Sequence, residues 1–254
     1  MTRLITSLEQ WRDVRIQLRE QGRTIGLVPT MGALHEGHIS LVEASLSQNQ
    51  VTVVSVFVNR TQFNDRADFD QYPRMIEEDV DRLSRSEVDY VLSPAFDAIY
   101  HDNYRYKVSE SEESKILCGP YRPGHFDGVL TVVMKLLNLV APHRAYFGEK
   151  DFQQLELIRG MVEAFFMDVE IVACPTVREV DGLAMSSRNL RLNERERQLA
   201  AQFPRILSEA KTDAEAVEKL TAAGFRVDYV ERYKDRRCAA VHLGEVRLID
   251  NIRM

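Results

Sequence analysis

Cysteine is scarce in this chain of 254 residues, and the sequence has no long apolar run. The three cysteines, Cys118, Cys174 and Cys238, are odd in number and far apart, which excludes a disulfide framework and a cysteine metal cluster. We therefore expect a cytoplasmic protein. The longest apolar runs have only the length of a strand, so we expect no transmembrane helix. The first residues show no apolar segment with a cleavage site, so we also expect no secretion signal.

Positive charge is also limited. The formal net charge is −6 at pH 7, whereas proteins that bind nucleic acids usually present a basic face. We therefore expect no nucleic-acid partner. The apolar content of 44% and the charged content of 28% are ordinary for a globular protein. A chain of this length can bury the core of one large domain, or of a main domain with a smaller one.

One stretch, residues 28–38 with the sequence VPTMGALHEGH, stands out. An apolar run over residues 24–28 predicts a buried strand that Pro29 and the following glycine end, and a helical apolar pattern comes next. A strand, turn and helix start leave free backbone N–H groups that can bind an anion. His35 and His38 are three positions apart, so we expect both on one face of the helix start. Imidazoles in that place can donate hydrogen bonds to phosphate oxygens.

The sequence His-x-Gly-His after a first strand resembles the signature of the adenylate-forming and nucleotidyl-transferring superfamily. Transfer-RNA synthetases share it, but the acidic net charge argues against a tRNA partner. The pair can also be an ordinary surface pair or half of a metal site. A zinc site from His35, His38, Cys118 and His125 is conceivable, yet their spacing matches no structural zinc pattern, and we predict no protein-held metal.

Strand-like and helix-like patterns alternate through the first two-thirds of the chain. Strands are expected over residues 24–28, 50–58, 88–92, 145–147 and 169–173. Helices are expected between them, and this alternation predicts an open Rossmann-like parallel sheet with helices on both of its faces. Ligands bind such sheets at the carboxyl ends of the strands.

Two segments of this region are predicted in more detail. Pro73 stands where it can open a helix that runs to about Ser86, because proline is tolerated best in the first turn. Residues 104–108 form a possible edge strand.

After Pro175 the pattern changes to helices followed by short strands. The expected elements are two amphipathic helices over residues 193–209 and 213–223, and strands over residues 226–230, 239–243 and 246–249. We therefore expect two domains, a Rossmann-like domain over residues 1–174 and a small α+β lid domain over residues 175–254.

Four further polar stretches lie at or just beyond the ends of predicted strands, over residues 57–63, 122–126, 147–154 and 181–189. With the His-x-Gly-His stretch and the closing residues 247–251, they resemble the pantoate–β-alanine ligase family over nearly the whole chain. Each stretch alone is a weak signal, but all of them in order are hard to obtain by accident.

The resemblance implies a two-step ligase reaction. The carboxylate of (R)-pantoate attacks the α-phosphorus of ATP, which releases pyrophosphate and leaves pantoyl adenylate. The amine of β-alanine then attacks the acyl carbon, AMP leaves, and the product is pantothenate, a precursor of coenzyme A. The resemblance also implies Mg²⁺ bound with the triphosphate, and a homodimer.

By this resemblance the first domain binds nucleotide and pantoate, and His38, His35 and Lys150 are the catalytic residues. Lys150 is a compact cation that can reach an α-phosphate, and Asp151 can accept hydrogen bonds from ribose hydroxyls. The segment 186–188 offers two hydroxyls and a guanidinium to a triphosphate. The residues expected to bind ATP are Met31, Gly32, His35, His38, Gly148, Lys150, Asp151, Val177, Met185, Ser186, Ser187 and Arg188.

The expected pantoate and β-alanine ligands are Gln62, Gln154, Asn59 and Arg122. The two glutamine amides can both donate and accept, which suits a substrate with hydroxyls and a carboxylate. Arg122, together with His125, can equally brace a turn that is rich in proline and glycine.

Two features depart from the family pattern. The family's loop usually reads Asn-Pro-x-Gln-Phe, and Arg60 takes the place of the proline, so we expect a less constrained loop before Gln62. We also expect a lid that is shorter than the family's, in which the segment from Tyr229 to Val241 lacks a strand connection.

Two other functions share the nucleotide motifs. One is a nucleotidyltransferase that stops at an adenylated product, and the other is a non-catalytic nucleotide-binding protein. Release of AMP that requires both pantoate and β-alanine separates the ligase from both.

Overall fold

A six-stranded parallel sheet forms the centre of the computed structural model, which describes residues 2–254. We call it the large sheet, and its strand order is β1-β4-β3-β2-β5-β6. The strands are β1 (Arg3–Ile5), β2 (Ile25–Thr30), β3 (Val51–Val56), β4 (Tyr90–Leu92), β5 (Arg144–Gly148) and β6 (Glu170–Cys174). From β2 the chain first proceeds toward β3 and β4, and later adds β5 and β6 on the other side. The strand order therefore reverses between β2 and β5, which is where open sheets of this kind bind ligands.

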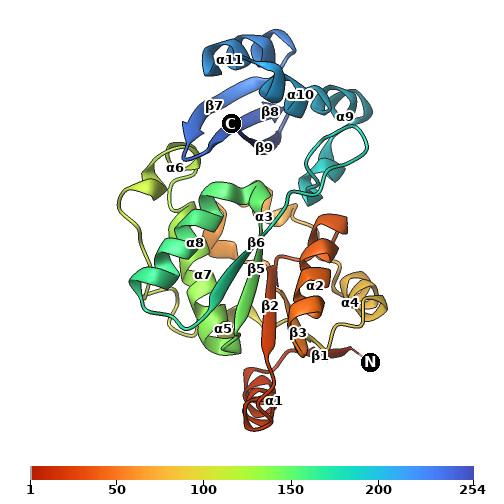
Figure 1. Ribbon diagram of the computed structural model, residues 1–254, viewed down its shortest axis with the longest axis vertical. Coiled ribbons are helices and arrows are strands. Elements are labelled where there is room, and N and C mark those ends of the chain that lie inside the picture. The colour runs from red at the N-terminus through yellow and green to blue at the C-terminus, as the bar shows by residue number, and fades with distance from the viewer. Residues whose placement is uncertain (1) are drawn as a thin grey trace.

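Helices cover both faces of the large sheet, as the sequence predicts (Figure 1). Val28 and Val54 pack on one face with α2 (Glu36–Gln48) and α4 (Ile76–Arg85). Their neighbours Leu27 and Val53 belong to the larger core on the opposite face, because successive strand residues point to opposite sides. That core is formed with α1 (Leu8–Glu20), α7 (His125–Val140) and α8 (Phe152–Ala164).

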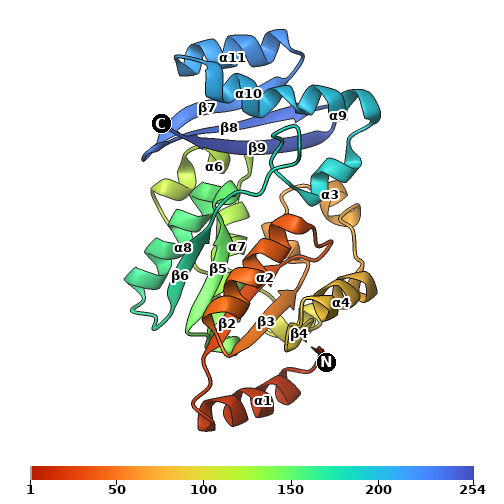
Figure 2. The same cartoon turned by 45° about the vertical axis from the view of Figure 1, so that its right-hand side comes forward.

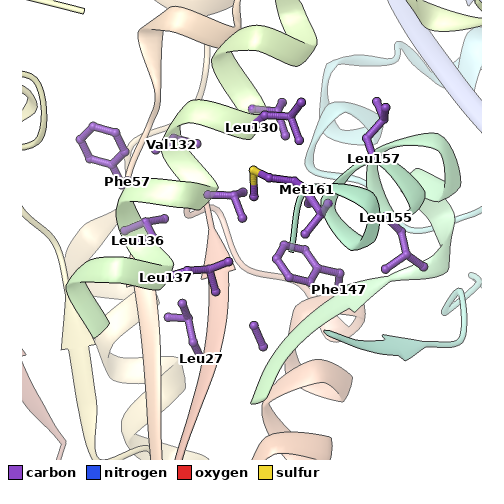
Figure 3. Close-up of a cluster of buried hydrophobic side chains, with 14 of the residues drawn as sticks. Leu27, Phe57, Leu130, Val132, Leu136, Leu137, Phe147, Leu155, Leu157 and Met161 are labelled. Atoms are coloured by element: carbon purple, nitrogen blue, oxygen red, sulfur yellow. The ribbon is translucent and has the colours of Figure 1, made fainter. Parts of the chain in front are cut away.

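Figure 3 shows the centre of this larger core. Leu136 and Leu137 of α7 lie beside Leu27 of β2, and Met161 of α8 lies near Phe147 of β5. All five are buried side chains of the same cluster, so burial of their apolar surface fixes α7 and α8 on the sheet. The expected site residues Arg122, Lys150 and Asp151 come just before these two helices, and Gln154 lies in the first turn of α8. The core therefore also fixes the site.

A second, three-stranded antiparallel sheet follows β6, and we call it the small sheet. It consists of β7 (Arg226–Tyr233), β8 (Arg236–Leu243) and β9 (Val246–Arg253). The helices α9 (Glu194–Ala200), α10 (Gln202–Glu209) and α11 (Asp213–Ala222) precede it, and α10 and α11 share an apolar core with it. Figures 1 and 2 both place the small sheet beyond the carboxyl ends of the large sheet, away from α1.

The prediction that Pro29 ends the first strand is wrong, because β2 continues to Thr30. The carbonyl of Ile25 accepts from His143 on the β5 side, and the carbonyl of Thr30 accepts from Phe57 on the β3 side. The backbone groups of successive strand residues point alternately to the two neighbouring strands, so the nitrogen of Pro29 points toward β5. The pairing of β2 with β5 already ends at Leu27. The missing N–H of the proline therefore removes no bond from the sheet.

The small-sheet strands are longer than the sequence predicts, and the expected lack of a connection is wrong. Lys234 and Asp235 join β7 to β8 in a two-residue turn, and Lys234 has a positive φ of 53°. Primed turns of this kind match the twist of a hairpin. The single helix expected over residues 193–209 is divided at Ala201, where Pro204 in the first turn of α10 removes an intrahelical N–H donor.

Three predictions for the region between β3 and α7 also need correction. The α4 helix begins at Ile76 rather than at Pro73, and the sequence missed the short α3 (Arg66–Asp70) before it. Residues 104–108 form no strand in the structure, because Tyr104 has a positive φ of 59° that is incompatible with an extended chain.

Across residues 2–254, no helix has both the length and the apolar character that a membrane crossing requires.

The close approach of β2 to α2 predicts that an alanine at Gly26 is destabilising. A Cβ on Gly26 would lie 2.5 Å from Nδ2 of Asn49 and would overlap Oγ of Ser45, which is held by a 2.8 Å bond to Thr52. Gly26→Ala should therefore lower the free energy of unfolding by about 1–3 kcal/mol, as overpacking usually does.

Gly160 is the matched control, because it lies inside α8 and an added Cβ would meet nothing within 4 Å. Gly160→Ala should raise the free energy of unfolding by about 0.5–1 kcal/mol, since glycine is a poor residue for a helix interior. Urea unfolding of both variants measures the two effects. Equal destabilisation by both would contradict the close approach of α2 to β2.

Candidate active site

A cavity of about 230 Å³ lies at the carboxyl ends of β2, β3, β5 and β6. Its walls come from five segments that are far apart in the sequence and include all but one of the predicted site residues. Those in the wall are Met31, His35, His38, Asn59, Gln62, Arg122, Gly148, Lys150, Asp151, Gln154, Val177, Met185, Ser186, Ser187 and Arg188. The position agrees with the reversal of strand order between β2 and β5.

Gly32 is the exception, because it is buried behind the cavity wall. Its φ is +80°, and a Cβ at this position would lie 2.8 Å from Oδ2 of Asp79. The glycine therefore lets the turn pass close to a carboxylate. This is a structural role, and the predicted contact of Gly32 with ATP stays a prediction.

The prediction of free N–H groups in this turn is wrong. The N–H of Ala33 donates to Oδ2 of Asp79 at 3.0 Å, and the N–H of Leu34 donates to Oδ1 at 2.8 Å. Asp79 is only 3% exposed, so the turn already surrounds an anion supplied by α4. Local sequence offers no signal for this role, since Asp79 follows Glu77 and Glu78 at a helix start, where acidic residues are usually solvent-exposed.

The two histidines occupy the first turn of α2 and cap it reciprocally. Nδ1 of His35 accepts from the N–H of Gly37 at 3.2 Å, and Nδ1 of His38 accepts from the N–H of His35 at 3.3 Å. The ring centroids are 4.1 Å apart. Because both Nδ1 atoms accept, each neutral ring carries its proton on Nε2, and each Nε2–H remains available as a donor.

Both imidazoles are neutral at pH 7. Burial, assisted by the charges of Lys150 and Arg82, lowers the pKa of His35 from 6.5 to about 4. Burial, the neighbouring His35 and the same two cations lower the pKa of His38 from 6.5 to about 3. The pair can therefore donate hydrogen bonds to developing charge on a phosphate without being protonated first.

Lys150 and Asp151 belong to the short 3₁₀ helix η3 (Glu149–Asp151) that follows β5. Nζ of Lys150 lies 3.6 Å from Oδ2 of Asp151, and the lysine side chain is mostly buried. Both line the cavity opposite the histidine turn. The ammonium is thus placed to meet an anion, and the carboxylate to accept from hydroxyls.

The segment after β6 lines the cavity with Val177 and residues 185–188. Val177 accepts through its carbonyl from the N–H of Met185 at 3.0 Å, so the two residues stand side by side. Within residues 2–254, the N–H of Val177 has no acceptor. Ser186 caps η4 (Ser187–Arg191) by accepting from the N–H of Arg188 at 3.3 Å.

The guanidinium of Arg188 donates to Oδ2 of Asp68 at 2.8 Å, and Arg191 donates to the other oxygen at 2.6 Å. Although burial raises it, the pKa of Asp68 is lowered overall by these two arginines. Asp68 lies in α3, which the sequence did not predict, so its part in the site was missed.

Asn59 orients the amide of Gln62. Its Nδ2 donates to Oε1 of Gln62 at 3.0 Å, and its Oδ1 accepts from the hydroxyl of Tyr100 at 2.9 Å. The Gln62 Nε2 is thereby directed to the sulfur of Met31, at 3.1 Å on the cavity wall. Asn59 is 1% exposed and its polar atoms are occupied, so it positions Gln62, whereas the sequence placed it among the ligands.

Arg122 and His125 form a second oriented pair beside Gln62. Nε2 of His125 lies 2.9 Å from a guanidinium nitrogen of Arg122, which can only donate, so Nδ1–H of His125 donates to the carbonyl of Gln62 at 2.8 Å. Burial lowers the pKa of Arg122 to about 10, helped by Arg188 and Arg247. Arg122 has no ion pair with a carboxylate of residues 2–254, and it faces the cavity.

The adjacent glutamines Gln153 and Gln154 have different surroundings. Gln153 is buried and bonds the N–H of Cys118 and the carbonyls of Glu113 and Ile116. Gln154 lines the cavity, and its amide bonds no other group that the structure describes. Only Gln154 is therefore available to a substrate.

The alternative zinc site is not formed. The thiol of Cys118 lies 3.1 Å from the hydroxyl of Tyr229, and both ring nitrogens of His125 are occupied. The part of the chain described here holds no group of three histidine, cysteine or acidic side chains arranged for a metal ion.

Comparison with known proteins supports one family throughout. A family model described as pantoate-β-alanine ligase matches residues 3–253. The pantothenate synthetase of Bdellovibrio bacteriovorus is 54% identical over 254 residues, which is the whole of both chains. The pantothenate synthetase of Coxiella burnetii is 50% identical over 256 residues, and the match covers 99% of this chain and 97% of that protein. The expectation of a shortened lid is therefore wrong for these two relatives.

Solved structures give the same result. The crystal structure of pantoate-β-alanine ligase from Francisella tularensis, complexed with βγ ATP and β-alanine, matches with a TM-score of 0.95 and 39% identity, covering 100% of this chain and 98% of that one. The pantothenate synthetase structure from Thermus thermophilus matches with a TM-score of 0.90 and 38% identity, covering 99% of both chains.

The parallel sheet, with helices on both faces and a polar cavity at the carboxyl ends of its strands, defines a Rossmann-like α/β protein, as the sequence predicts. A match over 251 of the 254 residues narrows this class to one family. The chain belongs to the pantoate–β-alanine ligase family.

The low pKa of His38 predicts a loss of stability in acid. Between about pH 3 and pH 6.5 the unfolded chain binds a proton on this residue that the folded chain excludes, so the free energy of unfolding falls as the pH is lowered. From pH 7 to pH 5, His38 alone should lower the free energy of unfolding by about 2 kcal/mol. His38→Asn keeps an acceptor for the N–H of His35 and should lose that much less in acid. Urea unfolding at both pH values measures this, and unchanged acid sensitivity would contradict the neutral imidazole.

Arg60 provides a second test, because it begins η1 (Arg60–Gln62), where proline is well tolerated. The preceding Asn59 is extended, with φ −81° and ψ 100°, as a residue before proline must be. The Arg60 side chain is exposed and does not line the cavity. Arg60→Pro should therefore order the Gln62 loop and tighten pantoate binding by about 0.4–1 kcal/mol.

Isothermal titration with pantoate measures this change, and Arg60→Ala is the control that removes the guanidinium without constraining the loop. Tighter binding by the proline variant alone is the expected result. Equal weakening by both substitutions would show instead that the guanidinium contacts the substrate.

Proposed function

We propose that this chain makes pantothenate by the ATP-dependent condensation of pantoate with β-alanine. The observation that carries the proposal is the cavity between β2 and β5, which is lined by two kinds of polar group. Imidazole, ammonium and guanidinium groups suit the phosphates of ATP, and the amides of Gln62 and Gln154 suit the hydroxyls and carboxylate of pantoate. Family membership over nearly the whole chain supports the same activity.

In the first step, a carboxylate oxygen of pantoate forms a bond to the α-phosphorus, and the bond from that phosphorus to the leaving pyrophosphate breaks. Negative charge develops on the phosphate oxygens. We assign the Nε2–H groups of His38 and His35 and the ammonium of Lys150 to this charge, because all three line one cavity and remain available as donors. The neutral imidazoles then act as hydrogen-bond donors, and neither has to transfer a proton.

In the second step, the amine of β-alanine attacks the acyl carbon of pantoyl adenylate, the acyl–oxygen bond breaks, and AMP leaves. The attacking amine loses a proton as the amide forms. Arg122 has a free positive charge beside Gln62, so we assign it to a substrate carboxylate. Asn59 acts through Gln62 rather than on the substrate.

The nucleotide is proposed to lie between the histidine turn and the segment after β6. The N–H of Val177 can donate to adenine, and Asp151 can accept from ribose. Met31, Gly148 and Met185 supply the surrounding wall, and the hydroxyls of residues 186–187 with Arg188 face the triphosphate.

Magnesium fits this site as a companion of the triphosphate. Mg²⁺ usually keeps several waters and binds largely through substrate phosphates, so a cavity wall with few carboxylates still fits it. When bound, the ion would neutralise charge on the triphosphate.

The arrangement of the whole molecule is part of the proposal. We assign residues 1–174 to nucleotide and pantoate binding and residues 175–254 to a lid that excludes water from the hydrolysable adenylate. A homodimer is proposed from the family resemblance. A cytoplasmic location is proposed from Cys118, Cys174 and Cys238, which are buried and free.

The function is tested by AMP formation with ATP, pantoate and β-alanine supplied together or one omitted. The expected result is turnover that requires all three. Release of pyrophosphate from ATP and pantoate without any AMP would identify an adenylylating enzyme instead. Release of neither pyrophosphate nor AMP would identify a binding protein. His38→Ala should fold and yet lose adenylation by about a hundredfold or more, as when one donor is removed from a transition-state site. Near-normal pyrophosphate release by this variant would refute the role of His38.

A further inference from the structure

The closing residues of the chain, Asp250 and Asn251, have no place in the reaction described above. They are neighbours in β9, yet both side chains are buried, with exposures of 2% and 3%. Polar side chains are buried to this extent only when hydrogen-bonded. Asn251 bonds η3, and Asp250 bonds the hairpin that leads to residues 185–188 of the cavity wall. The strand β9 also packs against η3 and η4.

Asn251 bonds the segment that carries Lys150. Its Nδ2 donates to the carbonyl of Glu149 at 2.9 Å and to the carbonyl of Lys150 at 3.0 Å. Its Oδ1 accepts from Arg236 at 2.8 Å, and the same guanidinium pairs with Glu149 at 2.9 Å. Since an arginine only donates and a carbonyl only accepts, these partners allow one orientation of the amide.

Asp250 bonds the segment that leads to residues 185–188. Its two carboxylate oxygens accept from the two terminal nitrogens of Arg178, at 2.7 and 2.9 Å. Arg178 also donates to the carbonyl of Gly182 at 3.0 Å, and it faces Ala184 across an antiparallel bridge. The fork–fork geometry fixes the base of this hairpin, which ends at Met185 and Ser186.

We propose that Asp250 and Asn251 are positioning residues for adenylation. The inference rests on the proposed roles of Lys150 and of residues 185–188. This dipeptide of the small sheet fixes the position of η3 relative to the hairpin that leads to residues 185–188. Each of the two segments is bonded to the dipeptide and not to the other segment through these side chains. Asn251 fixes the position of η3 and therefore the position of the Lys150 ammonium in the cavity. Asp250 fixes the hairpin that ends at Ser186 and leads to Arg188.

The physical reason is the precision that adenylation requires. A displacement of about 1 Å at a reacting group costs about a hundredfold in rate. The short helix η3 has three residues and no side-chain cap, so its own hydrogen bonds cannot fix its position. A buried amide that donates to two of its carbonyls supplies that constraint from outside.

The test is a double-mutant cycle with the full chain, read as the single-turnover rate of pyrophosphate release from ATP and pantoate. Asn251→Ala should lower this rate about tenfold to a hundredfold. In a Lys150→Ala background the same substitution should change the rate by less than about twofold, because its effect acts through Lys150. A loss that is equally large in both backgrounds would overturn the proposal.

Failure of the proposed function gives a different result, since the unaltered chain would then release no pyrophosphate from ATP and pantoate. Failure of the role assigned to Lys150 would instead give Lys150→Ala the normal rate. Asp213→Asn is the matched control for loosening of the small sheet, because it weakens the 2.7 Å ion pair with buried Arg237 away from the cavity. It should lower the melting temperature and leave the rate unchanged. A rate loss in this control equal to that of Asn251→Ala would overturn the proposal.

Asp250→Asn keeps the side-chain size and serves if Asn251→Ala does not fold. It should raise the KM for ATP about threefold to tenfold while the KM for pantoate stays constant, because the hairpin faces only the nucleotide. In an Arg178→Gln background the substitution should add no further change. Equal changes in both KM values would indicate a general structural role and overturn the proposal.

Discussion

Two hydrogen bonds to the carboxylate of Asp79 hold the turn between β2 and α2, and the positions of both imidazoles follow from them. Gly32 and Ala33 have positive φ values of 80° and 51°, and a left-handed residue other than glycine costs about 1–2 kcal/mol. The bonds from Ala33 and Leu34 to a buried carboxylate offset this cost. The next residue, His35, then begins α2 with a fixed direction.

The electrostatics of the cavity follow from burial and from backbone contacts. The capping bonds place the imidazole protons on Nε2, and burial keeps both rings neutral. The permanent positive charge comes from Lys150, Arg122 and Arg188, so the cavity does not depend on a histidine titration to attract anions. Asp151 and Asp68 pair with two of these cations, which limits their mutual repulsion before a substrate arrives.

Much of the fold could be predicted because each local pattern agrees with its surroundings. Val51 to Val56 are buried on both faces of the sheet, and a β-branched run indicates such a strand. The errors arose where a distant partner decides the outcome. Pro29 is tolerated in β2 because β5 stops pairing at Leu27, and this register is absent from the local sequence. Residues 104–108 had the composition of a strand but turn at Tyr104.

Motif and periodicity are local properties, so they are enough to identify the chemical groups of this protein and their order along the chain. Tertiary structure alone decided which of those groups remain free. Asn59 is occupied by Gln62 and Tyr100, whereas Gln154 is available. Asp79 meets its partners 45 and 46 residues away, and Asn251 meets Lys150 across 101 residues. A buried polar group is satisfied by whatever the fold brings to it, and local sequence carries no record of that partner.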